Sequence, residues 1–72
     1  DAWETHFRAS EFRPVFLRAE QLMEQVPGYA QAVEKAVAQV KYALATSDEE
    51  AIEVKGDRLV DLLLDVENQK PS

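Results

Sequence analysis

The chain has 72 residues, of which 46% are hydrophobic, and it contains no cysteine. A chain of this length holds one domain with one core, and without cysteine it forms neither disulfides nor thiolate metal sites. Fourteen acidic and eight basic residues give a formal net charge of −6 with no basic cluster, which argues against nucleic acid and anionic membrane surfaces as partners.

A first helix is predicted over residues 2–26. Its apolar residues are spaced alternately by four and three positions and line one helical face: Phe12, Phe16, Ala19, Met23 and Val26. Pro27 ends this helix because proline lacks a backbone N–H donor. A proline beyond the first turn costs a helix about 3 kcal/mol, so we expect a kink at Pro14 or a restart near Ser10.

A second helix is predicted over residues 29–45, after the Pro27-Gly28 pair. Its apolar stripe is formed by Val33, Val37, Val40 and Leu44. The stripe is narrow and is flanked by alanines, which suits close packing against neighbouring helices.

A third helix is predicted over residues 48–68. Ser47 and Glu50 match the spacing of a capping box at its start, where acidic residues also complement the helix dipole. Its apolar stripe contains Ile52, Leu59, Leu63 and Val66. Gly56 interrupts this stripe and costs about 1 kcal/mol relative to alanine, so we interpret it as a point of close backbone approach.

The two predicted connections are short, so successive helices must run antiparallel. No strand-like alternation extends beyond a few residues. The sequence therefore predicts an all-α fold, an antiparallel three-helix bundle that forms a single helical domain over residues 1–72.

The sequence offers little for catalysis. His6 is its one histidine, and no glutamate three positions earlier makes it part of a metal-binding pair, so we interpret it as an ordinary exposed or half-packed side chain. Only Gly28 and Gly56 are available for a phosphate-binding loop, and each fits a helical role instead. We expect no enzyme activity, no metal and no cofactor.

The acidic side chains of the third helix recur every four residues: Glu49, Glu53, Asp57, Asp61 and Asp65. Each step rotates by about 40° around the helix axis, so the series forms a slow spiral and not a converging carboxylate cluster. The simpler interpretation is a solvated face. The alternative is a docking surface for a basic partner, for which Glu53, Asp57 and Asp61 are the candidate contact residues.

Aromatic residues gather in the first sixteen positions, where a bundle this small has little surface left to cover them. Core packing is the commoner fate of aromatic residues at helical spacing, but aromatic side chains are also enriched at interface hot spots. Trp3, Phe7 and Phe12 are therefore candidate contacts with a protein partner, and a homodimer is one expected arrangement.

No apolar run approaches the roughly 20 residues that a membrane span requires, so we expect no membrane insertion. The absence of cysteine favours the cytoplasm as the default location. Because the chain begins at Asp1 and lacks a basic-then-apolar leader, we expect it to be a piece of a longer protein.

Two stretches, AEQLMEQ from Ala19 and the segment from Val33 to Glu67, carry a resemblance over roughly two thirds of the chain. A helix ends in Tyr42-Ala43-Leu44, a polar turn contains Ser47-Asp48, and the next helix begins with Glu50-Ala51-Ile52-Glu53. This arrangement resembles the distal bundle of the C-terminal helical lid of DnaK-type heat-shock chaperones.

In that family the lid closes over an unfolded polypeptide held by a separate β-sandwich, and ATP is hydrolysed in another domain. The resemblance implies that this chain regulates the binding and release of unfolded polypeptide without touching nucleotide. A second hypothesis stays open, in which the chain is a stand-alone acidic helical adaptor or oligomerisation module that binds a protein partner.

Overall fold

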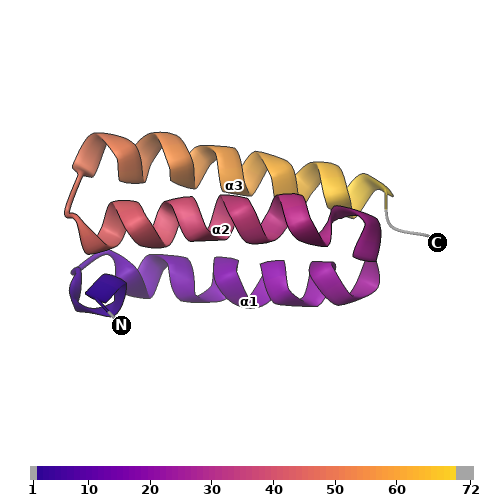
Figure 1. The fold of residues 1–72 in the computed structure, drawn as a ribbon, viewed down its shortest axis with the longest axis horizontal. Helices are drawn as coiled ribbons and strands as arrows, with labels where there is room; N and C mark the ends of the chain where they lie inside the picture. Colours follow the sequence, from indigo (N-terminus) through magenta and orange to yellow (C-terminus); the bar gives the residue numbers. More distant parts are fainter. Residues whose placement is uncertain (1, 70–72) are drawn as a thin grey trace.

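The computed structural model describes residues 2–69, and every element within them is helical (Figure 1). In chain order the elements are the 3-10 helix η1 (Ala2–Thr5), α1 (Ala9–Gln25), the 3-10 helix η2 (Pro27–Tyr29), α2 (Ala30–Ala45) and α3 (Glu49–Gln69). The chain reverses direction at each connection between the long helices, so α1 and α3 run parallel to each other and antiparallel to α2. This confirms the predicted all-α three-helix bundle.

The start of the first long helix differs from the predicted span of 2–26. The backbone N–H of Ala9 donates to the carbonyl of His6 at 3.0 Å, and the N–H of Arg8 donates to Nδ1 of His6 at 3.0 Å. These bonds close a turn between η1 and α1, and the restart of the helix therefore lies at Ala9. Pro14 itself lies inside α1.

The connection between α1 and α2 follows the prediction closely. α1 ends at Gln25, and the N–H of Val26 still donates to the carbonyl of Leu22 at 2.8 Å. Pro27 then occupies the first position of η2, where the missing N–H has no helical partner to lose. α2 begins at Ala30, one residue after its predicted start.

The connection between α2 and α3 is a Schellman motif. Ser47 adopts the left-handed conformation with φ of 54°, and its N–H donates to the carbonyl of Leu44 at 3.2 Å. The N–H of Asp48 donates to the carbonyl of Ala43 at 3.1 Å. Two carbonyls at the end of α2 are thereby satisfied, and the chain is turned back within three residues.

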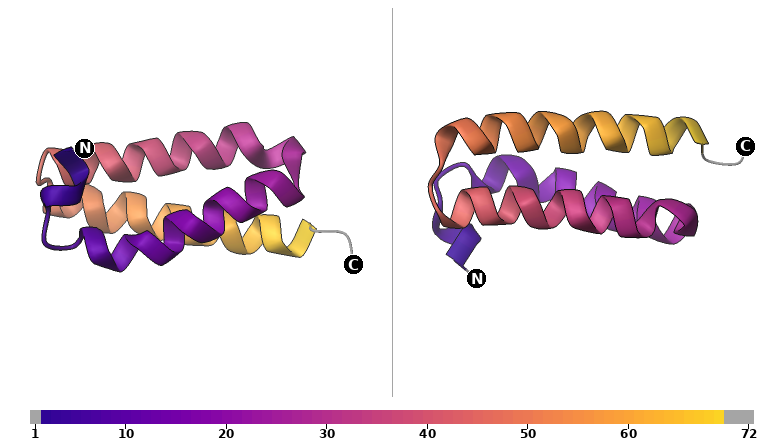
Figure 2. Two further views of the ribbon diagram at one scale, coloured as in Figure 1. Left: turned by 90° about the horizontal axis from the view of Figure 1, so that it is seen from below. Right: turned by 45° about the horizontal axis from the view of Figure 1, so that its top comes forward.

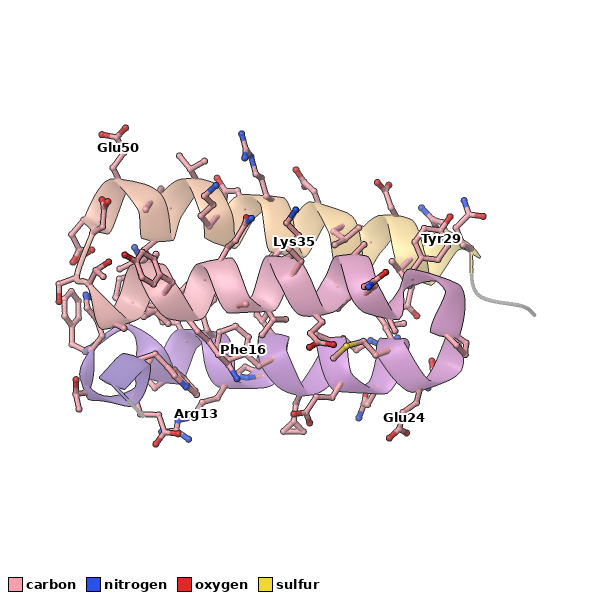
Figure 3. The ribbon with its side chains drawn as sticks, in the orientation of Figure 1. Arg13, Phe16, Glu24, Tyr29, Lys35 and Glu50 are labelled. Atoms are coloured by element: carbon pink, nitrogen blue, oxygen red, sulfur yellow. The ribbon has the colours of Figure 1, made fainter. Side chains whose placement is uncertain are left out.

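The start of α3 corrects the predicted capping box. Asp48 occupies the cap position, because its Oδ1 accepts a hydrogen bond from the N–H of Ala51 at 3.1 Å. Ser47 lies in the turn that follows α2, one position too early to cap α3. Glu50 projects away from the bundle (Figure 3), so the reciprocal bond of a capping box is not formed.

The core is formed by one apolar stripe from each helix. Seen from two further directions, the helices enclose the core as a triangle, because α1 lies out of the layer of α2 and α3 (Figure 2). The main cluster of buried residues is Phe12, Phe16, Ala19, Leu22, Val33, Val40, Ala43, Leu44, Ile52, Leu59, Leu63 and Val66. Met23 and Val37, also predicted, are partly buried against it. Gly56 is buried, but its close neighbour is the side-chain ring of Phe12 and not a second backbone as predicted, because the ring occupies the space that a side chain at position 56 would take.

Candidate protein-contact surface

The structure separates the three aromatic candidates. Phe12 is only 7% exposed and packs in the core at an interplanar angle of 22° to Phe16. The expectation that Phe12 contributes to a contact surface is therefore wrong, because α3 covers its ring at Gly56. Phe7 is 79% exposed and stacks on His6 with ring centroids 4.7 Å apart, so it is the one candidate aromatic that faces solvent.

Trp3 attaches the first residues of the chain to the bundle. Its ring meets Phe16 edge to face, with centroids 5.2 Å apart and planes at 85°. Lys41 of α2 places Nζ 5.2 Å from the Trp3 centroid, and the guanidinium carbon of Arg13 lies 5.8 Å from it. The indole Nε1 is buried without a hydrogen-bond partner among residues 2–69. Trp3 is thus mainly a packing residue, with a polar atom left unsatisfied.

His6 and Arg8 connect the start of α1 to the start of α3. Nε2 of His6 lies 3.3 Å from Oε1 of Glu49, and the imidazole is 5% exposed. Because its Nδ1 accepts from the backbone, a neutral His6 carries its proton on Nε2, the atom that faces Glu49. The Arg8 guanidinium donates to Glu11 at 3.2 Å and to Glu53 at 3.0 Å, and these bonds raise the pKa of Arg8 above its ordinary value.

A second cross-link joins α1 and α3 farther along the bundle. Nη2 of the Arg18 guanidinium donates to both carboxylate oxygens of Glu67, so one nitrogen bridges the two oxygens. Beside this pair lies a surface groove, which we call the α1–α3 groove. Its lining consists of Pro14, Val15, Arg18, Val60, Leu63, Leu64 and Glu67.

The structure places all three acidic candidates on the exposed side of α3. Glu53 is held by Arg8, whereas Asp57 and Asp61 form no ion pair within residues 2–69. Each of these two aspartates precedes an apolar groove residue by three positions, Val60 and Leu64 respectively. Residues three apart are neighbours on a helix surface, so the aspartates border the α1–α3 groove.

A second hollow lies on the other side of α3. It is lined by α2 and α3 and includes Tyr42, Thr46, Ala51 and Lys55. Tyr42 is largely exposed there. The hydroxyl of Thr46 donates to the carbonyls of Tyr42 and Ala43 at 3.0 and 3.3 Å, so it satisfies carbonyl groups in the last turn of α2.

Within residues 2–69 no group of three histidine, cysteine or acidic side chains is placed to hold a metal ion. None of the described helices combines the length and the apolar composition needed to cross a bilayer. A comparison with protein-family models, curated proteins and solved structures found no match.

Sequence reasoning missed the polar cross-links and the groove. The Arg8–Glu11 pair has the i, i+3 spacing that a sequence reader can recognise. The bonds from Arg8 to Glu53 and from Arg18 to Glu67 join residues 45 and 49 positions apart, and no local pattern signals them. They depend on how α1 is rotated against α3.

Proposed function

We propose that this chain is the C-terminal helical lid of a DnaK-type chaperone and regulates the binding and release of unfolded polypeptide. The main observation in support is the agreement between the bundle and the segment that carries the resemblance. The Tyr42–Leu44 end of one helix, the Ser47-Asp48 turn and the Glu50–Glu53 entry form a single tightly bonded connection between α2 and α3.

A lid has to move as one body, and two features of the bundle favour such behaviour. The three stripes share one continuous core, and two sets of charged side chains cross-link α1 to α3, one at Arg8 and one at Arg18. A lid needs no nucleotide-binding site in this chain, because ATP would be hydrolysed in a separate domain. A chaperone of this kind would act in the cytoplasm, in protein folding and the stress response.

The test uses the complete polypeptide to which these residues belong, with and without residues 1–72. A fluorescein-labelled unfolded peptide is bound in the presence of ADP, and its dissociation is followed by anisotropy. A lid slows release, so its deletion should accelerate peptide dissociation at least tenfold while ATP hydrolysis continues. An unchanged release rate, or a complete polypeptide without a peptide-binding domain, would contradict the proposal.

The second candidate is a stand-alone acidic adaptor, and the α1–α3 groove favours it. Val60 and Leu64 remain substantially exposed beside this groove although the core is otherwise complete. An adaptor would bind its partner as the isolated 72-residue chain, independently of nucleotide and of any other domain. Sedimentation of the isolated chain across a concentration series separates an oligomerisation module, which forms dimers, from an adaptor, which stays monomeric.

A further inference from the structure

The α1–α3 groove is an open apolar hollow of about 320 Å³ on the parallel pair of helices. Its floor is the core residue Leu63, and its walls are Pro14 and Val15 on one side and Val60 and Leu64 on the other. In the bundle α2 packs against α1 and α3 from the opposite side (Figure 2). No helix within residues 2–69 covers this groove from outside.

The exposed apolar side chains at the groove are spaced as helix-binding surfaces are. Val60 and Leu64 are one turn apart on α3 and are 42% and 59% exposed. On α1, Pro14 is exposed and Val15 is half-buried at the groove. Two parallel rows of apolar side chains with a hollow between them match the apolar stripe of an amphipathic helix, which inserts residues at i, i+3 or i+4, and i+7.

The lining does not suit a small polar ligand. Its only charged members are Arg18 and Glu67, and these two side chains are bonded to each other. A small-molecule site needs a few convergent polar groups to orient its ligand. The α1–α3 groove therefore offers apolar contact along its floor, and any charge recognition must come from its rim.

The rim of the groove is acidic. α3 carries seven acidic and two basic residues. Asp57 and Asp61 lie beside Val60 and Leu64, whereas Lys55 of the same helix lines the hollow on the α2 side. The one cation in the lining of the groove, Arg18, is already paired with Glu67.

From this combination we propose that the α1–α3 groove docks an amphipathic helix of a partner protein, with apolar residues on its inner face and lysine or arginine at its edges. The helix lies along the groove and completes a four-helix arrangement. Its cations meet Asp57 and Asp61, and its apolar stripe covers Val60 and Leu64. This inference depends on the groove alone and holds whether or not the chain is a chaperone lid.

A second copy of the chain is a poor occupant of the same groove. A twofold contact places the same surface of both copies face to face. It would bring the acidic rims at Asp57 and Asp61 close to their own counterparts, and like charges across an interface oppose association. Charge complementarity thus favours a basic helix from a different protein.

The test uses an 18-residue fluorescein-labelled peptide as the probe, with leucine at helical spacing of three and four and lysine at the flanking positions. Binding to the 72-residue chain is followed by fluorescence anisotropy. We expect saturable binding that weakens as sodium chloride is raised from 50 to 500 mM. A peptide with glutamate in place of each lysine should bind at least tenfold more weakly.

Matched variants locate the binding site. Val60→Ser with Leu64→Ser should weaken binding of the lysine peptide at least tenfold, and Val54→Ser should change it less than twofold. Val54 is the matched control because it lies on α3 with the same 42% exposure as Val60. Asp57→Asn with Asp61→Asn should weaken binding and flatten its salt dependence, whereas Glu20→Gln with Glu34→Gln removes the same charge from exposed positions on α1 and α2 without this effect.

All substituted side chains are exposed, and circular dichroism verifies that each variant retains its helical content. The proposal is overturned if the lysine peptide does not bind, if the groove variants bind it as the native chain does, or if the glutamate peptide binds equally well. It is also overturned if sedimentation reveals a homodimer of the native chain that Val60→Ser with Leu64→Ser dissociates, because a second copy is then the occupant.

Discussion

Phe12 of α1 and Gly56 of α3 are in direct contact across the bundle. A Cβ placed on Gly56 would lie 2.9 Å from both Cε1 and Cζ of Phe12, closer than carbon atoms approach in packed proteins. The Phe12 ring is also held by its neighbour Phe16. The glycine thus sets how closely α1 and α3 can approach while a large aromatic ring is packed between them.

Gly56→Ala should therefore destabilise the bundle although alanine is the better helix former. The propensity gain is about 1 kcal/mol, and overpacking a filled core costs about 1–3 kcal/mol. We expect a net loss of up to about 2 kcal/mol in the free energy of unfolding, measured by urea denaturation. In a Phe12→Leu background the same change should be neutral or stabilising, because the clashing ring atoms are gone.

Gly28→Ala is the matched control for this experiment. A Cβ on Gly28 meets no atom within 4 Å, and its φ is not positive, so alanine there should be neutral or slightly stabilising. If Gly56→Ala had the same effect with Phe12 and with Leu at position 12, the ring would not be the limiting neighbour.

The sequence predicted the fold because its three apolar stripes have clear helical periods. The stop at Pro27 was also readable, since it follows from the backbone chemistry of proline. A tight contact at Gly56 was readable too, but not that an aromatic ring makes it. The restart at Ala9 was predicted only as one of two alternatives, the other being a kink at Pro14. Its position depends on the two hydrogen bonds that His6 accepts from the backbone. The roles of Ser47 and Asp48 were missed because serine and aspartate both favour helix caps, so the pattern alone does not place the cap between them.

Ser47→Gly should stabilise the chain. Ser47 holds the left-handed conformation at φ of 54°, which costs a residue with a side chain about 1 kcal/mol more than glycine. We expect a gain of about 0.5–1 kcal/mol in unfolding free energy and a higher midpoint in thermal denaturation. The neighbouring change Ala45→Gly, at the end of α2, should be destabilising instead, since the residue there is helical. Equal effects of the two substitutions would refute the conformational explanation.

Trp3→Ala and Phe7→Ala should differ, because Trp3 packs on Phe16 and Phe7 faces solvent. We expect Trp3→Ala to lower the unfolding free energy by about 1–3 kcal/mol, less than for a fully buried ring. Phe7→Ala should stay within about 0.5 kcal/mol of the native chain. Thermal unfolding monitored by circular dichroism measures both. A larger loss for Phe7→Ala than for Trp3→Ala would reverse this assignment.

The contact surface was less predictable than the fold. Asp57 and Asp61 were chosen for their spacing along one helix, but the sequence gives no sign that they border an apolar groove. Whether the aspartates border the groove depends on how α3 is rotated about its axis relative to α1. The Arg18–Glu67 and Arg8–Glu53 bonds form in that same orientation. Phe12 was assigned both to the apolar stripe and to the candidate contacts, and its burial beside Gly56 leaves only the first of these.

The Arg18–Glu67 pair should contribute little to stability although it engages both carboxylate oxygens, because both side chains are more than a third exposed. A double-mutant cycle with Arg18→Met and Glu67→Gln should give a coupling free energy of about 0.2–1 kcal/mol at low salt, and less in 1 M sodium chloride. A cycle of Arg18→Met with Glu34→Gln on α2 is the control and should give no coupling. A salt-independent coupling above this range would indicate that the pair is desolvated.

Pro14→Ala should stabilise the bundle. Pro14 lies in the second turn of α1, where it removes the N–H that would otherwise bond to the carbonyl of Ser10. Its ring is exposed at the groove, so little packing is lost when it is removed. Alanine restores the bond but also frees the unfolded chain, so we expect a net gain of about 1–2 kcal/mol in unfolding free energy by urea denaturation.

Pro14→Gly separates the two contributions, because it restores the same N–H but lowers helix propensity by about 1 kcal/mol relative to alanine. The free energy of unfolding of the glycine variant should therefore lie between that of the native chain and that of the alanine variant. If both substitutions destabilised the chain, the proline ring would be supporting the α1–α3 groove that it lines. In that case the groove would be a rigid feature of the bundle. Pro14 would maintain its shape, although the same proline removes a hydrogen bond from α1.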